Sequence, residues 1–433
     1  MGQKPETRLK LNSWFLPTIV GLLLVWQLIA PYPGLVILLV GLGGAWLIGY
    51  LWARSLARGL RLTRQVRFGW AQVGDRLEER FTLINDQWAS ALWVEIVDHS
   101  TMSGYEVGRA TGIAGNELIR WSKKGICTRR GLFTLGPTSL LTGDPFGLYT
   151  VSLHYAASIP FMVMPPVVPL PTIDISPGGR AGEGRPRANA PERTVSAASV
   201  REYVPGDSLR WIHWPTSARQ GSLFVRLFDG VPAGDWWILL DMDRDAQVGE
   251  GQNSTEEHGV ILAASLADQE LRSGRAVGLM AHGEDLVWLP PRGGEGRRWE
   301  ILRSLARVSP GERALSELLA RMEPALGQHA SLIIITSAVD GEWIEALVPL
   351  LRRGVAPTVL LLDPVSFGGT GNVRGMTASL SGLGVAHHVI TRDLLDRPEA
   401  RPGRQGRWEW RIGGTGRAVP VHRHRDVAWK ALV

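Results

Sequence analysis

Two long uncharged apolar runs stand in tandem near the N-terminus and constrain the fold more than any other feature. The first covers residues 14–30 and the second residues 35–52, with the turn-forming sequence PYPG between them. Roughly 17–25 apolar residues in a helix are enough to cross the hydrocarbon core of a bilayer. A signal peptide followed by a buried helix is the alternative, but the first run lacks a small-residue cleavage pattern. We therefore expect a membrane α-hairpin.

The charges that flank these runs predict the orientation of the hairpin. Basic residues precede the first run (Lys4, Arg8 and Lys10) and follow the second (Arg54, Arg58, Arg61, Arg64 and Arg67), while the turn between the runs carries no charge. Cytoplasmic flanks are enriched in Lys and Arg, and such arginines can also lie against anionic headgroups. Residues 1–67 are thus expected to form a two-pass anchor in the cytoplasmic membrane, with both termini and the soluble domains in the cytoplasm.

The rest of the chain carries almost no net charge, which argues against nucleic acid as a partner. Residues 1–67 hold eight Lys/Arg and one acidic residue, so of the 47 basic and 41 acidic residues of the chain, 39 and 40 remain beyond the anchor. A nucleic-acid-binding surface needs a basic stripe, and no such run is visible. Cys127 is the only cysteine, which excludes an intrachain disulfide and a zinc site built on paired cysteines.

Beyond the anchor the sequence pattern divides the chain into a β-rich part and an α/β part. Residues 68–165 contain short alternating stretches such as RFTLIN and LWVEIVDH, typical of an antiparallel β-sandwich. Residues 166–199 form a Pro/Gly-rich linker. Residues 231–395 alternate between buried strands such as WWILLDMD and helices, and predict a doubly wound α/β domain. Residues 396–433 are a C-terminal extension.

One helix of the α/β part carries clear end signals. In the segment 254–274, Ser254 and Glu257 form a capping-box pair and Gly274 is a plausible stop. Further strands are expected in AVGLMAHG, SLIIITSAV and APTVLLLDP, and further helices in GRRWEILRSLARV and EWIEALVPLLRRG. No phosphate-cradling glycine loop opens any of these helices, so a nucleotide site is not supported.

The segment 200–230, which reads VREYVPGDSLRWIHWPTSARQGSLFVRLFDG, connects the two parts and carries a family resemblance. With the upstream stretches RRGLFTLGP and DPFGLY, it resembles the domain of unknown function 58 family of bacterial proteins. The resemblance implies a membrane hairpin, a β-rich segment and a von Willebrand factor A-like domain. It also implies an association with MoxR-type AAA+ ATPases.

The polar and aromatic residues of this connector have two interpretations. Asp207 is suited to cap a short helical turn, with Arg210 and Arg219 around it and with Trp211 and Trp214 covering apolar surface. The connector would then brace two domains. Alternatively these five residues form an exposed surface that binds a partner protein, because Trp and Arg dominate interface hot spots.

The end of the first strand of the α/β part carries three aspartates. Metal-binding factor A-like domains have an Asp-x-Ser-x-Ser loop there, whereas this chain has Asp241, Asp243 and Asp245. Three carboxylates on one loop can chelate Mg²⁺ or Ca²⁺, but the same loop is also compatible with a solvated acidic turn.

These features predict a membrane-anchored scaffold or adaptor that binds other proteins and is not itself an enzyme. The alternative is a phosphatase of the haloacid dehalogenase class, which uses an Asp-x-Asp pair such as Asp241 and Asp243 after a buried strand. That class also needs a lysine on a later loop. Beyond the anchor the sequence has only Lys123, Lys124 and Lys430, and Arg is no equivalent replacement.

Overall fold

The structure is a computed structural model that divides into two compact units. It describes residues 5–67, 69–170, 173, 175, 197–204, 212–228, 235–327, 330–395, 410–412, 418–420 and 430–431. The β unit comprises Met1–Val168, Leu302–Arg307 and Pro398–Val433, and the α/β unit comprises Pro169–Ile301 and Val308–Arg397. Each unit is described by itself below.

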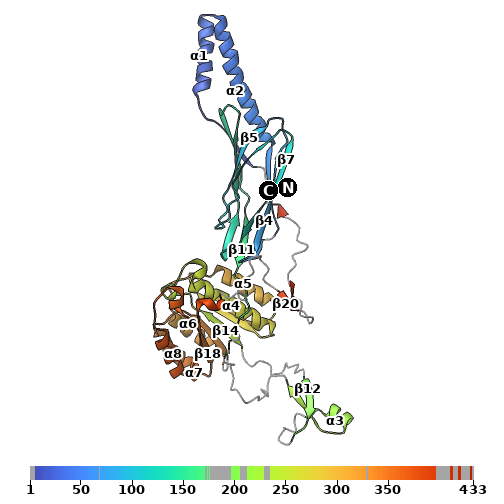
Figure 1. The fold of residues 1–433 in the computed structure, drawn as a ribbon, viewed down its shortest axis with the longest axis vertical. Helices are drawn as coiled ribbons and strands as arrows, with labels where there is room; N and C mark the ends of the chain where they lie inside the picture. Colours follow the sequence, from blue (N-terminus) through green and yellow to red (C-terminus); the bar gives the residue numbers. More distant parts are fainter. Residues whose placement is uncertain are drawn as a thin grey trace. The chain divides into compact units, whose positions relative to one another are not determined.

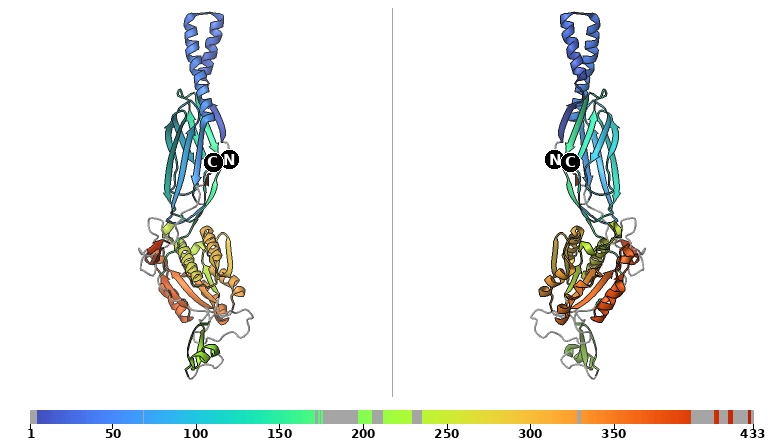
Figure 2. Two further views of the ribbon diagram at one scale, coloured as in Figure 1. Left: turned by 90° about the vertical axis from the view of Figure 1, so that its right-hand side faces the viewer. Right: turned by 90° about the vertical axis from the view of Figure 1, so that its left-hand side faces the viewer.

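The two apolar runs form two helices that lie side by side. Helix α1 spans Phe15–Ile29 and α2 spans Pro33–Gly59, with Pro33 in the first turn of α2, where its fixed φ suits the start of a helix. The two helices run next to each other in views at right angles (Figure 1, Figure 2). Among the described residues α2 is the one helix long and apolar enough to cross a membrane, and α1 is apolar but has only 15 residues.

The β unit consists of sheets that share one core and are antiparallel, as the alternating pattern predicts, except that β3 pairs parallel to β11. One sheet has the strand order β1-β10-β9-β5-β6 and another has β22-β2-β4-β7, while β3, β11 and β8 form a smaller sheet. The strands are β1 (Glu6–Leu11), β2 (Leu60–Val66), β3 (Trp70–Gln72), β4 (Arg76–Asn85), β5 (Ala91–Asp98), β6 (Arg109–Ile113), β7 (Glu117–Ile126), β8 (Gly131–Leu135), β9 (Thr138–Gly143), β10 (Tyr149–Tyr155), β11 (Ile159–Met164) and β22 (Lys430–Ala431).

Alternation along the strands explains this core. In β4, Leu77, Phe81 and Leu83 are buried and lie in one cluster with Val94 of β5 and Leu140 of β9. A strand directs alternate side chains to opposite faces, so one face of each sheet is apolar and packs on the other. Strands β1 and β2 lie within residues 1–67, which the sequence pattern assigns to the anchor. The segments that precede and follow the hairpin are therefore strands of the β unit.

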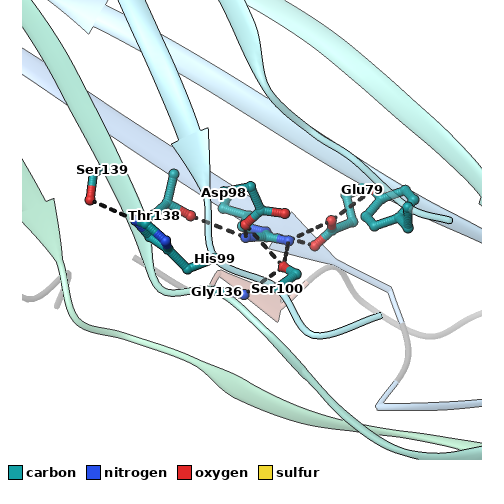
Figure 3. A network of polar contacts seen from close by, with 9 residues as sticks. Glu79, Asp98, His99, Ser100, Gly136, Thr138 and Ser139 are labelled. Atoms are coloured by element: carbon teal, nitrogen blue, oxygen red, sulfur yellow. Dashed lines mark hydrogen bonds and ion pairs between the residues drawn. The ribbon is translucent and has the colours of Figure 1, made fainter. Parts of the chain in front are cut away.

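A buried polar network around Glu79, Asp98 and Ser100 links the two larger sheets (Figure 3), and Arg64 of β2 contacts all three residues. Its guanidinium donates two hydrogen bonds of 2.8 Å to the carboxylate of Glu79 on β4, and one of 2.6 Å to Asp98 on β5. It also donates to Ser100 Oγ and Thr138 Oγ1. Arg64 and Glu79 are at most 1% exposed, so the charges of this ion pair are compensated by each other rather than by water.

This position differs from the sequence expectation for Arg64. As one of the basic residues after the second run, it was expected near lipid headgroups. The structure places it inside the β unit instead, because β2 pairs with β4 and directs alternate residues, Arg64 included, into the interior. The neighbouring Arg61 points outward and pairs with Asp86 at 3.1 Å. Only Arg54 and Arg58 of that group lie exposed on α2.

The α/β unit has one six-stranded sheet with the order β16-β15-β14-β17-β18-β19. All neighbouring strands are parallel except β16, which is antiparallel to β15 at the edge. Counted along the chain this is the order 3-2-1-4-5-6 of doubly wound sheets. The strands are β14 (Trp236–Leu240), β15 (Val277–His282), β16 (Leu286–Arg292), β17 (Ser331–Thr336), β18 (Ala356–Leu362) and β19 (Ala386–Ile390).

Helices cover both faces of this sheet. Leu240, Ile335 and Leu362 lie against Gly259 of α4 on one face. The opposite face, with Leu239 and Ile334, packs on α6, α7 and α8. The helices are α4 (Thr255–Arg272), α5 (Glu295–Arg307, of which the residues from Leu302 are counted in the β unit), α6 (Leu315–Met322), α7 (Leu347–Arg352), α8 (Val373–Gly382) and the short α9 (Arg392–Leu395).

Most of the predicted elements of the α/β unit are present. The Ser254 side chain caps α4 by accepting a hydrogen bond from the backbone N–H of Glu257, and Gly274 follows the helix with a positive φ of 83°. The predicted helix at EWIEALVPLLRRG is broken into a 3₁₀ turn, Glu342–Ile344, and α7. Strand β16 was not expected, because its sequence contains two adjacent prolines, which are tolerated only at a sheet edge.

Two further pieces are described in part. Strands β12 (Ala197–Glu202) and β13 (Phe224–Phe228) pair antiparallel, and helix α3 (Trp214–Gln220) lies between them in the chain. Strands β20 (Trp410–Ile412) and β21 (Ala418–Pro420) form a second pair. Most of the expected linker, 166–199, and of the C-terminal extension, 396–433, lies outside the described residues.

Candidate functional site

The candidate site is at the carboxyl edge of the six-stranded sheet, between β14 and β17. These strands are neighbours, but the chain leaves β14 toward β15 on one side and leaves β17 toward β18 on the other. In open α/β sheets, ligands bind in the crevice at such a topological switch point. Asp241 directly follows β14 and Thr336 ends β17, so both residues lie at this point.

Asp241 is held rigidly at the switch point. It is 2% exposed. One carboxylate oxygen, Oδ2, accepts a hydrogen bond of 2.6 Å from Thr336 Oγ1, and Oδ1 accepts one of 3.0 Å from the backbone N–H of Asp243. The backbone N–H of Asp241 donates to the carbonyl oxygen of Ile335. Both carboxylate oxygens therefore have donors from the protein itself.

Burial makes the charged form of this carboxyl unfavourable. Desolvation raises the pKa of Asp241 to about 6, although the hydrogen bonds from Thr336 and Asp243 act in the opposite direction. The nearby carboxylates of Asp243 and Asp340 add to the rise, and the pKa of Asp243 is itself raised, mainly by desolvation. A strongly perturbed carboxyl at a switch point is a physical criterion for a functional site.

Polar side chains from three elements fix the loop that carries Asp241. Gln247 donates through Nε2 to the carbonyl oxygen of Asp241 at 3.1 Å and accepts through Oε1 from Thr255 Oγ1 at 2.8 Å. Ser337 Oγ donates to the carbonyl oxygen of Ala246 at 2.7 Å. No sequence pattern pointed to Gln247 and Thr255, since their partners are seven or more residues away or are backbone atoms.

The three aspartates are not gathered into one cluster of carboxylates. Asp243 uses Oδ1 to accept from the backbone N–H of Asp245 and so caps a 3₁₀ turn, Arg244–Ala246. Across the described part of the chain, no group of three or more His, Cys, Asp or Glu side chains is placed to hold a metal ion. Asp241 Oδ2 accepts from the Thr336 hydroxyl, and Asp241 Oδ1 and Asp243 Oδ1 accept from backbone N–H groups of the loop, so these three oxygens are already engaged by protein donors.

The connector residues are described only in part. Asp207, Arg210 and Trp211 lie outside the described residues. Trp214 and Arg219 are both exposed, at the first and the penultimate position of α3, and Trp214 is 64% exposed. Most of the Trp214 side chain therefore lies open to solvent.

Helix α3 is capped by a residue that the sequence interpretation overlooked. His213 accepts a hydrogen bond through its side chain from the backbone N–H of Thr216, and its Nδ1 lies 2.7 Å from Thr216 Oγ1. The backbone of His213 also pairs with Phe224, which ties the start of α3 to β13. The exposed Trp214 and Arg219 are thus presented on a short, well-capped helix.

The fold and the switch-point loop define a class of two-unit proteins, in which an antiparallel β unit with an apolar hairpin is joined to a doubly wound α/β unit. The chain belongs to the family described as protein of unknown function DUF58, whose sequence model matches residues 199–427. The matched region includes the connector and the acidic loop.

Relatives resemble the chain over different shares of its length. It is 26% identical to "Uncharacterized protein YeaD" of Bacillus subtilis (strain 168) over 321 residues, which cover 70% of this chain and 76% of the relative. It is 27% identical over 172 residues to "Uncharacterized protein Rv1480" of Mycobacterium tuberculosis (strain ATCC 25618 / H37Rv). That match covers 38% of this chain and 54% of the mycobacterial protein, so the chain spans about half of that relative.

The similarity to solved structures is weak. Proximal thread matrix protein 1 from the mussel byssus aligns over 38% of this chain and 43% of its own, with a TM-score of 0.29 and 11% identity. Similarity at that level carries no argument about function.

Proposed function

We propose that the protein is a membrane-anchored cytoplasmic scaffold or adaptor without catalytic activity of its own, whose α/β unit is a von Willebrand factor A-like domain that binds other proteins. The observation that carries the proposal is the continuity of α2. This helix is apolar and unburied from Pro33 to Ile48, is first buried at Gly49, and passes at Leu60 directly into β2. An anchor fused in this way to a folded unit holds the attached domains at a membrane.

The two-pass orientation rests on charge. Lys10 precedes α1, Arg54 and Arg58 follow the exposed part of α2, and the turn at 30–32 is uncharged. The positive-inside rule then places both ends of the hairpin in the cytoplasm.

Labelling with a membrane-impermeant thiol reagent tests this orientation. We expect a cysteine at Tyr32, which lies exposed in the turn, to react from outside intact cells of a bacterial host. A cysteine at Leu132, an exposed position on β8, is expected to react only after the cells are permeabilised. Reaction of Leu132→Cys in intact cells would contradict the cytoplasmic placement, and equal protection of both sites would contradict the crossing.

The proposed partner is a MoxR-type AAA+ ATPase, as the family resemblance implies, and α3 is the proposed contact. Support comes from the exposure of Trp214 and Arg219 on this helix, because desolvation of Trp and Arg side chains dominates many interfaces.

Co-purification of the full chain with a MoxR-type ATPase from the same genome tests the partner. Trp214→Ala and Arg219→Ala are each expected to weaken capture at least about tenfold, as for a hot spot worth about 1.4 kcal/mol or more. Arg374→Ala, an exposed arginine on α8, is the matched control and is expected to leave capture unchanged. If all three variants captured the ATPase equally well, the proposal that α3 forms the contact would be wrong.

The phosphatase alternative has less support. Asp241 is enclosed, with both oxygens accepting hydrogen bonds, whereas a nucleophile must reach its substrate. The sequence between Lys124 and Lys430 contains no lysine, so the α/β unit cannot supply the lysine that such enzymes use.

A further inference from the structure

The end of the β unit from which the hairpin leaves is formed by two loops that flank α2. One loop joins β4 to β5 and the other joins β9 to β10. A Cβ atom at Gly59 of α2 would lie within 3 Å of Gln87 in the first loop, and one at Gly49 would lie 3.2 Å from Asp144 in the second. The backbone N–H of Asn12, just before α1, donates to Leu148. Both helices therefore meet the same end of the unit.

Large apolar side chains at this end are substantially exposed to solvent. Trp88 belongs to the first loop, Leu92 and Trp93 to the start of β5, Phe146 to the second loop, and Trp14 and Phe15 to the start of α1. Each is between 44% and 76% exposed. We call this set the aromatic collar. Exposed apolar patches of this kind usually mark a surface that binds a protein or a membrane.

A β-bulge is responsible for part of the collar. The pairing of β5 with β6 shifts register between Ala91 and Val94. In a regular strand, Leu92 and Trp93 would point to opposite faces, but here both are exposed. Bulges re-aim side chains in this way, and at this bulge two consecutive apolar residues are turned outward, at the end of the unit next to α2.

Where α2 passes the aromatic collar, its side chains change from apolar to aromatic and then to basic. The exposed part of the helix up to Ile48 is apolar. The turns around Ile48 carry aromatic residues with polar partners: Trp46 donates through Nε1 to the hydroxyl of Tyr149 at 2.7 Å, and Trp52 donates through Nε1 to the carbonyl oxygen of Ser90 at 3.0 Å and packs edgewise on Trp88. Exposed Arg54 follows. Apolar, aromatic and then basic is the order from the hydrocarbon core through the interface to anionic headgroups.

The length of the exposed part of α2 also favours contact between the base of the hairpin and the membrane. Pro33–Ile48 has about 16 residues, or roughly 24 Å at 1.5 Å per residue, and α1 with its 15 residues is slightly shorter. The hydrocarbon core is about 30 Å thick. A hairpin that is several ångströms short can cross only if the bilayer thins or if the residues at its base enter the membrane. The residues at its base are the aromatic collar.

We propose that the aromatic collar inserts into the interfacial layer of a lipid bilayer, so that the β unit is seated in the membrane surface rather than held away from it on a tether. This inference rests on the proposed anchoring role, because it requires the hairpin to cross the membrane. It assigns Trp88, Trp93 and Phe146 a contact with lipid at the level where Trp side chains bury their rings and keep their N–H groups in water.

Depth-dependent fluorescence quenching of the full chain tests the proposal. The chain is reconstituted into vesicles of phosphatidylcholine and phosphatidylglycerol that carry nitroxide lipids, with the nitroxide either near the headgroups or at the bilayer centre. Single reporters are attached at Phe146→Cys or Leu92→Cys, one on each side of α2. The native thiol does not interfere, because burial raises the pKa of Cys127 to about 12 and shields it from reagents.

Two further reporters serve as controls. Val40→Cys lies in the exposed part of α2 and reports whether the hairpin enters the bilayer at all. Leu132→Cys is as exposed as Trp88, at 57% against 58%, but lies on β8. Strand β8 is at the opposite end of the unit, since the residue after it, Gly136, donates to Ser100 just beyond the end of β5.

Each pattern of quenching decides between specific outcomes. The proposal expects loss of emission at positions 146 and 92 with the shallow nitroxide, loss at 40 with the deep one, and none at 132. A second pattern is quenching of the reporter at position 40, with the reporters at 146 and 92 as unquenched as the one at 132. This result would overturn the collar proposal alone, and would leave a protein as the partner that covers this surface. Absence of quenching at 40 would overturn the anchor, and with it the proposed function.

Discussion

Replacement of Arg64 by methionine is expected to lower the free energy of unfolding of the β unit by about 3–5 kcal/mol, the range observed when one partner of a buried ion pair is removed. Methionine matches the length of the arginine stem but leaves the carboxylates of Glu79 and Asp98 without a cation in the interior. Tyr105 donates to Glu79 at 2.8 Å, but a phenol hydroxyl carries no positive charge and so cannot replace the lost cation.

The matched control is Arg61→Met on the same strand. Arg61 pairs with Asp86 at the surface, and exposed pairs contribute about 0–1 kcal/mol. Hydrogen–deuterium exchange of the full chain in increasing urea, read in peptides from β4 and β7, measures the stability of the β unit in both variants. A loss below about 1 kcal/mol for Arg64→Met would show that water reaches the network and screens its charges.

Asp241→Asn is expected to stabilise the α/β unit at neutral pH and to flatten its dependence on pH. The pKa of Asp241 is about 6 in the folded chain against an ordinary value of 3.8. A carboxyl whose pKa is raised by folding stabilises the fold only while it is protonated. That contribution is complete below about pH 4 and is lost as the pH rises through 6. The difference of about 2 units corresponds to a cost of up to about 3 kcal/mol at pH 7.

Thermal unfolding of the full chain between about pH 4 and pH 8 measures this effect in the transition of the α/β unit. The stability difference between Asp241→Asn and the parent is expected to grow across that range. Asp340→Asn, an exposed carboxylate on the neighbouring loop, is the control and is expected to change stability by a few tenths of a kcal/mol. A difference that does not vary with pH would mean that Asp241 is charged throughout and that its hydrogen bonds outweigh burial. If millimolar Mg²⁺ abolished the stability difference between Asp241→Asn and the parent, the result would indicate that Asp241 does bind a metal ion.

Local sequence signals predicted much of the α/β unit. The continuous apolar runs at Trp236–Leu240 and Ser331–Thr336 are buried parallel strands. The Ser254 cap was also correctly identified, because a capping interaction spans only three residues. The same reasoning placed Asp241 at the end of the first buried strand of the α/β part, but the sequence did not show that Thr336, 95 residues later, donates to it.

The sequence by itself therefore determined the apolar hairpin, the alternation between strand and helix, and the position of the acidic loop, because each depends on neighbours within a few residues. Only the tertiary structure decided which charges are buried. Arg64 looks like its neighbours Arg61 and Arg67 in the sequence, yet it is internal because β2 pairs with β4 and faces Asp98 of the opposite sheet. The sequence was compatible with a Trp214 that covers apolar surface or with one that is exposed, and in the structure it is exposed. Burial depends on which distant segments come together, and side-chain type within one segment does not specify that.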